Sequence, residues 1–152
     1  MKPIRIIFVC HGNICRSPMA EFIMKDLVEK KKLSARFLIT SAAATTEEIG
    51  HDMYPPAKRM LTAMNVPFEK RRAHLLTREE YESADYILAM DEENLYHLSR
   101  ITGGDPEKKI SLLLSHAGRK GEVADPWYTG DFKETYEDIL TGCLGLLEEI
   151  SG

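Results

Sequence analysis

Residues 9–18, which read VCHGNICRSP, constrain the possible folds of this chain more than any other segment. The apolar run before them, residues 4–9, predicts a short buried strand. The pair Ser17-Pro18 predicts a helix start, with serine as the N-cap and proline at the first helical position. A strand end and a helix start are thus separated by one tight loop. Because such a junction presents backbone N–H groups at the positive end of a helix dipole, we expect it to bind an anion.

The side chains of this loop indicate which anion it binds. Five residues separate Cys10 from Arg16, and that length of chain can wrap around one tetrahedral anion. Gly12 permits close backbone approach and Asn13 tolerates the left-handed conformation, so successive N–H groups can form an anion nest. Arg16 adds a guanidinium fork for two oxygens. We therefore predict a phosphate site formed by His11, Gly12, Asn13, Ile14, Cys15, Arg16 and Ser17.

Cys10 lies at the entrance of this site. Donors that bind an anion also favour a thiolate, so we expect Cys10 to be ionised at neutral pH and to act as a nucleophile. Taken alone, Cys10 could be a buried apolar thiol at a strand end, and Ser17 could serve the thiolate, cap the helix, or do both. Cys10, His11 and Cys15 could also bind a metal ion. No second ligand pair with zinc-type spacing exists, however, and we predict no metal site.

The rest of the chain alternates apolar runs with helical patterns. Strands are predicted at residues 4–9, 37–41, 86–90 and 109–114. Five helices are predicted. The first follows Ser17-Pro18, the second covers residues 55–64, and the third begins at a capping box at 77–80. The fourth covers residues 92–98 with Asp91 as N-cap, and the last begins near Asp131. The last helix has an apolar stripe of Tyr136, Ile139, Leu140, Cys143, Leu147 and Ile150. We therefore predict one α/β domain over residues 1–152, a three-layer sandwich with a four-stranded parallel sheet, helices on both faces and the phosphate loop after the first strand.

Composition limits the partners of such a site. The 152 residues carry a net charge of −4, so we expect no nucleic-acid binding and no membrane binding, and local donors must hold any phosphate. The first apolar run is too short for a membrane span, and we read no targeting segment. Three cysteines, an odd number, do not resemble a secreted disulfide framework. These features predict a reducing, cytoplasmic setting.

Four segments together carry a family resemblance. They are residues 10–21 (CHGNICRSPMAE), Ser41-Ala42, residues 86–91 (YILAMD) and Asp125-Pro126. Through them, essentially the whole chain resembles the low-molecular-weight protein tyrosine phosphatases. The resemblance implies hydrolysis of phosphotyrosine and small aryl phosphates through a cysteinyl-phosphate, without a cofactor. It makes Cys10 the nucleophile, Arg16 the stabiliser of the equatorial oxygens and Asp125 the general acid and base, although a residue before proline is by itself a turn residue.

The resemblance also implies residues that support the loop. Asn13 and Ser41 would hold the phosphate loop through hydrogen bonds. From its place beside Cys10 in the loop, we also expect Ser17 to support the site, by donating its hydroxyl to the thiolate when it leaves phosphorus. The curled loop also brings Cys15 near Cys10, so we expect a reversible disulfide that protects the nucleophile from oxidation.

The walls of the substrate cleft depart from the family pattern. Trp127 and Tyr128 follow the expected acid and would line the cleft, although they could also be core aromatics. An aromatic residue that many relatives carry before Ile49-Gly50 is replaced here by Glu47 or Glu48. A histidine common in eukaryotic relatives is replaced near Lys70 or Arg71, so we expect a different network around Asn13.

Related proteins share this loop but differ elsewhere. Thioredoxin-coupled arsenate reductases need two further cysteines near the middle of the chain, whereas the other cysteine here is Cys143, in the last helix. Protein-arginine phosphatases carry Thr in place of Ile14 and smaller residues at positions 127 and 128. A thiol redox sensor or a silent phosphotyrosine-binding module would not require Asp125. We therefore expect a protein-tyrosine phosphatase, a monomer or weak dimer, with phosphotyrosine proteins and a tyrosine kinase as partners and inorganic phosphate as product.

Overall fold

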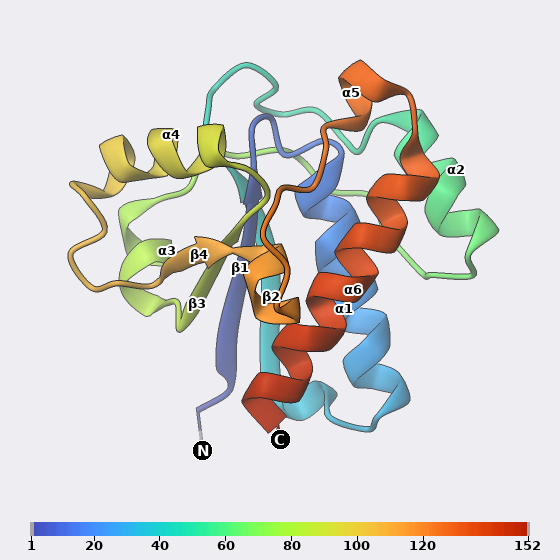
Figure 1. Ribbon diagram of the computed structural model, residues 1–152, viewed down its shortest axis with the longest axis horizontal. Helices are drawn as coiled ribbons and strands as arrows, with labels where there is room; N and C mark the ends of the chain where they lie inside the picture. The colour runs from blue at the N-terminus through green and yellow to red at the C-terminus, as the bar shows by residue number, and fades with distance from the viewer. Residues whose placement is uncertain (1, 152) are drawn as a thin grey trace.

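A computed structural model describes residues 2–151 (Figure 1). Its strands are β1 (Ile4–Cys10), β2 (Phe37–Ala43), β3 (Tyr86–Ala89) and β4 (Ile110–Leu112). Its α-helices are α1 (Arg16–Lys30), α2 (Pro55–Ala63), α3 (Arg78–Ser83), α4 (Glu92–Thr102), α5 (Pro126–Thr129) and α6 (Phe132–Ser151). Two short 3₁₀ helices, η1 (Ser34–Arg36) and η2 (Leu113–Ala117), complete the list of helices among the described residues.

The four strands form one parallel sheet in the order β2-β1-β3-β4, which confirms the predicted sheet. The chain leaves β1 toward β2 on one side and later returns to β3 on the other side. The strand order therefore reverses at β1, and ligands of such sheets bind beyond the carboxyl ends of the strands at this point. Cys10 is the last residue of β1. The predicted phosphate loop thus lies where the topology favours a binding site.

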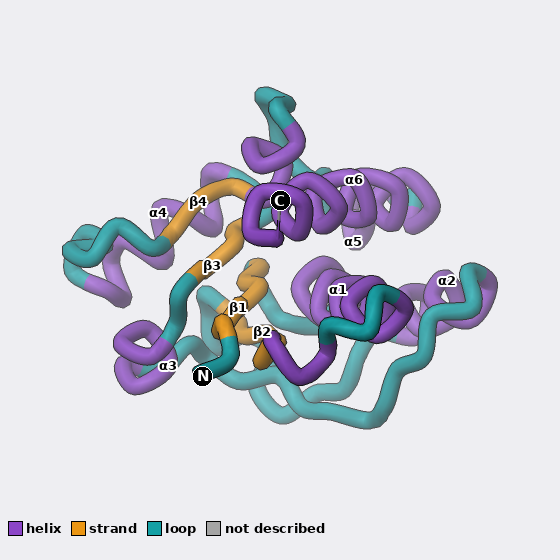
Figure 2. Tube along the Cα trace, turned by 90° about the horizontal axis from the view of Figure 1, so that it is seen from below, coloured by secondary structure: helices purple, strands orange, loops and turns teal. Residues whose placement is uncertain are grey.

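Helices cover both faces of the sheet, so the predicted three-layer arrangement is confirmed. Figure 2 shows the sheet between α1 and α6 on one side and α3 and α4 on the other. The alternation of β1 explains the two layers, because successive side chains point to opposite faces. Ile6 and Phe8 enter the core that includes α1 and α6, whereas Ile7 and Val9 enter a second core that includes Tyr81 of α3. Burial on both faces accounts for the continuous apolar run of this strand.

The predicted helix caps are only partly correct. Thr77 and Glu80 form the predicted capping box of α3, and Asp91 caps α4 by accepting a hydrogen bond from the Asn94 amide at 2.7 Å. Ser17, by contrast, is not an N-cap. Helix α1 begins at Arg16, and Cys15 at its N-cap position makes no side-chain hydrogen bond. The hydroxyl of Ser17 is engaged in the loop instead, and the first turn accommodates Pro18 because that turn needs no N–H from it.

The C-terminal part of the chain differs from the prediction at one strand. The fourth strand ends at Leu112, earlier than residue 114, because η2 turns the chain toward α6 and buries Leu113. Gly142 of α6 permits this contact, since a Cβ there would lie 2.5 Å from Cγ of Leu113. The predicted stripe of α6 faces inward: Tyr136, Ile139, Cys143 and Leu147 are buried, and Leu140 and Ile150 are partly buried. Among residues 2–151, every helix is too short or too polar to cross a membrane.

Candidate active site

The thiol of Cys10 lies against the first turn of α1. The backbone N–H of Ser17 points at the Cys10 sulfur from 3.3 Å, and the Ser17 hydroxyl lies 3.1 Å from the same atom. Both groups are buried. An N–H, a hydroxyl and the positive end of a helix therefore converge on this sulfur.

Asn13 holds the loop from within. It is fully buried and adopts the left-handed conformation with φ of 60°. Its side-chain amide donates to the hydroxyl of Ser17 at 2.7 Å and to that of Ser41 at 3.0 Å. Ser41 in turn donates to Glu21 of α1 at 2.6 Å. The three residues expected to support the loop, Asn13, Ser17 and Ser41, therefore lie in one hydrogen-bonded chain that links the loop to β2 and α1.

Arg71 completes this network from a distant segment. Its Nη2 donates to both the backbone carbonyl of Asn13, at 2.6 Å, and the side-chain Oδ1 of Asn13, at 2.5 Å. Burial lowers the pKa of Arg71, against the nearby carboxylates of Glu21 and Asp52, which raise it. The altered network expected near Lys70 or Arg71 is therefore built by Arg71.

Arg16 is buried with 2 % of its surface exposed, and its guanidinium is held by fixed partners. Nη1 donates to Oδ2 of Asp91 at 2.6 Å and to the carbonyl of Val123 at 3.0 Å. Burial opposes the charge, yet the negative charges of Cys10, Asp91 and Asp125 outweigh it and raise the pKa of Arg16. Asp91 therefore has two roles, since it caps α4 with one oxygen and orients Arg16 with the other.

Asp125 reaches the same place from the other end of the chain. Its Oδ1 accepts the backbone N–H of Trp127 at 3.0 Å and caps the one-turn helix α5. Its Oδ2 lies 3.4 Å from Nη2 of Arg16. The turn role and the site role of Asp125 thus coexist, one for each oxygen. Asp125 reaches Arg16, although the two residues are far apart in the sequence, because α5 and the carboxyl end of β1 lie at the same end of the molecule (Figure 1).

A cavity of about 210 Å³ opens above the loop. Its lining includes Cys10, Arg16 and Asp125 at one part and the aromatic pair Trp127 and Tyr128 at another. Trp127 is 54 % exposed and Tyr128 is 84 % exposed, so the alternative that they are core aromatics is wrong. Trp127 packs on Tyr54, with ring centroids 4.8 Å apart.

Acidic residues form another part of the cavity wall. Glu47 and Glu48 line it together with the loop residues His11, Gly12, Ile14 and Cys15. Gly12 lies so close to Glu48 that a Cβ at this position would be 3.0 Å from Cγ of the glutamate. The loop therefore has little room for a side chain at position 12.

Cys15 differs from Cys10 in its surroundings. It is buried, and burial together with the negative charge of Cys10 raises the pKa of its thiol well above the ordinary value. The three cysteines of residues 2–151 are all free thiols.

The sequence model described as low molecular weight phosphotyrosine protein phosphatase matches residues 5–152. The chain belongs to this family. The protein-tyrosine phosphatase YfkJ of Bacillus subtilis is 37% identical over 149 residues, which cover 97% of this chain and 96% of that protein. The corresponding phosphatase of Gallus gallus is 38% identical over 151 residues, covering 95% and 94% of the two chains.

Solved structures agree with this membership. The crystal structure of YfkJ matches with a TM-score of 0.94 at 36% identity, covering 99% of this chain and 96% of that one. The crystal structure of a Drosophila arginine phosphatase matches with a TM-score of 0.87 at 30% identity, covering 98% and 99%. As a low molecular weight phosphotyrosine protein phosphatase, the chain is a hydrolase that acts on phosphoproteins.

Some residues of this phosphatase site were missed by sequence reasoning. Asp91 was read only as a helix cap, although it lies within the segment 86–91 that carries the resemblance. Glu21 was likewise included only as the last residue of the segment 10–21, and Tyr54 had no signal of its own. The predicted loop residue His11 also has unexpected neighbours, because Glu93 and His97 of α4 lie beside it and could hold a metal ion.

Proposed function

We propose that this phosphatase hydrolyses phosphotyrosine in two steps through a cysteinyl-phosphate. The observation that carries the proposal is the convergence on one cavity of the Cys10 thiol, the buried Arg16 guanidinium and the Asp125 carboxyl group. They come from the end of β1, the start of α1 and the start of α5. A nucleophile, a stabiliser of phosphoryl charge and a proton donor are the three groups that such a reaction needs.

In the first step, the Cys10 thiolate attacks phosphorus and an S–P bond forms as the ester P–O bond breaks. Asp125, in its protonated form, gives its proton to the departing phenolate oxygen. The loop amides and Arg16 bind the equatorial oxygens, which carry the charge of the transition state. Asp91 acts as a positioning residue, because its 2.6 Å hydrogen bond fixes the plane of the guanidinium.

In the second step, Asp125 accepts a proton from water while the water oxygen attacks phosphorus. The S–P bond breaks, inorganic phosphate is released and Cys10 returns to the thiolate. The hydroxyl and amide of Ser17, at 3.1 and 3.3 Å from the sulfur, stabilise the negative charge that appears on the leaving thiolate.

Aryl phosphates suit the cavity better than phosphoarginine. Trp127, supported by Tyr54, and Tyr128 present aromatic surface at the cavity, and Ile14 adds an apolar side chain to the loop. Aromatic rings pack favourably on a phenyl ester, whereas a guanidinium phosphate gains more from polar partners. We expect Glu47 and Glu48 to favour substrates with basic residues near the phosphotyrosine.

The test compares wild type, Cys10→Ser, Asp125→Asn and the remote control Cys143→Ala. Cys10→Ser should abolish turnover, and Asp125→Asn should lower kcat by about 10² to 10⁴ while keeping α5 capped, since Asn caps as well as Asp. The loss for Asp125→Asn should shrink with esters of more acidic phenols, which leave without a proton. Equal losses for all esters would refute Asp125 as the acid. Faster turnover of phosphoarginine than of phosphotyrosine peptide would refute the substrate assignment.

A further inference from the structure

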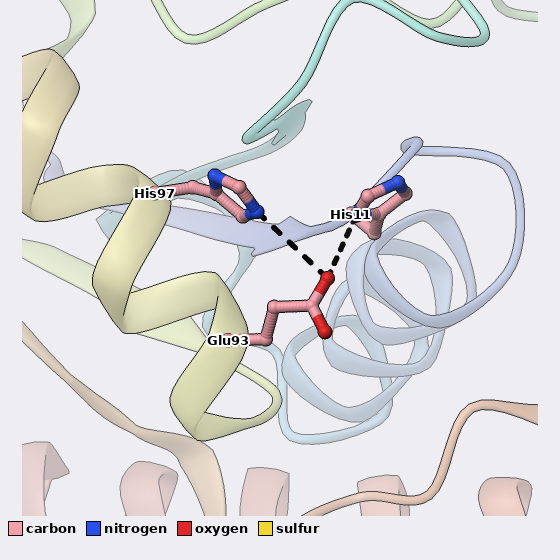
Figure 3. A group of neighbouring side chains, drawn as sticks. All are labelled: His11, Glu93 and His97. Atoms are coloured by element: carbon pink, nitrogen blue, oxygen red, sulfur yellow. Dashed lines mark ion pairs between the residues drawn. The ribbon is translucent and has the colours of Figure 1, made fainter.

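Three side chains gather at the rim of the phosphate loop, outside the set that performs the hydrolysis. His11 comes from the loop, and Glu93 and His97 come from α4 (Figure 3). Each offers one ligand atom, and the three atoms lie within 4.8 Å of one another. Figure 3 shows both imidazoles directed at the same oxygen of Glu93. Two imidazoles and a carboxylate are a common ligand set for zinc.

The distances fit a zinc ion after small movements. Oε1 of Glu93 lies 3.5 Å from Nδ1 of His11 and 3.8 Å from Nε2 of His97. A tetrahedral zinc ion with bonds of about 2.0–2.1 Å separates neighbouring ligand atoms by about 3.3 Å. Glu93 is 67% exposed and His97 is 33% exposed, so both can make this adjustment without disturbing a core. The fourth position remains for water.

His11 has a partner that orients it for metal binding. Its Nε2 contacts the carboxylate of Glu47, while its Nδ1 faces Glu93. When Nε2 donates its proton to Glu47, Nδ1 presents a lone pair toward the cluster. A carboxylate behind a histidine in this way fixes the tautomer and the ring orientation at metal centres. The lone pair and the Glu93 oxygen then face each other, and a cation between them removes their repulsion.

The helix supplies the other two ligands in a suitable geometry. Glu93 and His97 are four residues apart on α4, so their side chains lie on one face of the helix. Asp91 at the N-cap anchors this helix and also binds Arg16. A proton on His11 could bridge His11 and Glu93, and helix spacing places His97 beside Glu93, but a cation is the one partner that uses all three ligand atoms at once.

We propose that His11, Glu93 and His97 form a binding site for one Zn²⁺ ion at the rim of the phosphate loop. The ion links the loop residue next to Cys10 to helix α4. Two nitrogen donors select zinc over Mg²⁺ and Ca²⁺, which prefer oxygen ligands. The sequence did not indicate this site, because His11 is 82 positions away from Glu93 and the pair Glu93 and His97 alone is not a zinc motif.

The test measures zinc binding directly and does not depend on turnover. Because Cys10 is itself a possible zinc ligand, all proteins carry Cys10→Ser. Cys15 stays, since its thiol is buried and burial raises its pKa. Zinc is titrated by calorimetry and by competition with a chromophoric chelator. We expect one ion per chain, and at least a ten-fold weaker affinity after His97→Ala or Glu93→Gln.

His51→Ala is the matched control. The side chain of His51 is 67% exposed and lies outside the cluster, and its one ion pair among the described residues is with Glu48, at 3.4 Å. It should leave zinc affinity unchanged, and thermal unfolding should show that every variant is folded. The proposal is wrong if zinc does not bind at one ion per chain, if His97→Ala binds zinc as tightly as His51→Ala, or if Mg²⁺ binds equally well.

Discussion

Replacement of Asn13 by glycine tests how the phosphate loop is held. Asn13 combines a left-handed backbone, φ of 60°, with a fully buried amide that makes four hydrogen bonds, of which the one from the His74 N–H, at 3.4 Å, is the longest. Glycine adopts the same backbone conformation without strain, so Asn13→Gly removes the side-chain hydrogen bonds and keeps the shape of the loop. Once the extra freedom of glycine in the unfolded chain is subtracted, the measured loss therefore reports the buried side chain and its hydrogen bonds.

The size of the loss follows from the network. The amide donates to Ser17 and Ser41 at 2.7 and 3.0 Å and accepts from the charged Arg71 at 2.5 Å. Neutral hydrogen bonds contribute about 1 kcal/mol each, and one to a charged group contributes about 1.5–3 kcal/mol. Arg71 keeps its bond to the Asn13 carbonyl at 2.6 Å, which lowers its share of the loss. We therefore expect Asn13→Gly to lower the free energy of unfolding by about 3 kcal/mol.

The assay is urea unfolding followed by circular dichroism, together with thermal unfolding. For a chain of this length, about 3 kcal/mol corresponds to a fall in Tm of roughly 6–12 °C. Asn65→Gly is the control, because Asn65 is also left-handed, with φ of 58°, but is exposed. It should change stability by less than about 0.5 kcal/mol. A loss for Asn13→Gly as small as that for Asn65→Gly would refute the reasoning.

A double-mutant cycle adds a second check. Ser41→Ala removes the acceptor of the 3.0 Å hydrogen bond from Asn13. Because both residues belong to one network, the double variant Asn13→Gly/Ser41→Ala should lose less stability than the sum of the single variants, by about 0.5–3 kcal/mol. Simple additivity would show that the two side chains act independently. Because the loop loses its support, kcat/KM for an aryl phosphate should fall by more than ten-fold in Asn13→Gly.

Three further predictions concern oxidation, substrate and pH. Peroxide should inactivate the enzyme by forming a sulfenic acid on Cys10, which condenses with the Cys15 thiol to give a disulfide and water. After Cys15→Ser, reductant should recover less activity than in wild type. Equal recovery would contradict the protective disulfide. Trp127→Ala should raise KM for phosphotyrosine peptide by roughly ten-fold, with little change for inorganic phosphate as inhibitor. Hydrogen bonding to Glu80 raises the pKa of His74 above 6.5, and hydrogen bonds overcome burial to lower that of Glu80 below 4.5. Between pH 4.5 and 6.5 His74 is charged and Glu80 is ionised, so the loss in free energy of unfolding caused by His74→Ala should be largest there. The loss should shrink as pH rises through the raised pKa of His74. A loss that urea unfolding shows to be the same at every pH would contradict this.

The sequence alone was sufficient for features that depend on nearby residues. The strand, loop and helix start around Cys10 were predicted because their contacts span only a few positions, from Cys10 to Ser17. The parallel sheet followed from strands that alternate with helices. Even here Ser17 was wrongly predicted to be an N-cap. Its hydroxyl instead hydrogen-bonds with the sulfur of Cys10 and accepts a hydrogen bond from the side-chain amide of Asn13.

Contacts between distant segments were decided only by the tertiary structure. Asp125 was placed at the site by resemblance, since nothing near it in the chain distinguishes a proton donor from a turn residue. Arg71 on Asn13, Asp91 on Arg16 and Glu93 beside His11 are separated by 58, 75 and 82 positions. Asp91 and Glu93 meet their partners because the sheet order β2-β1-β3-β4 brings the carboxyl ends of β1 and β3 to one edge. Arg71 reaches the loop because its segment pairs with the end of β2, through Leu75 and Ala43. The sequence therefore determined the strand, loop and helix start around Cys10, whereas tertiary packing determined which side chains orient that loop and surround it.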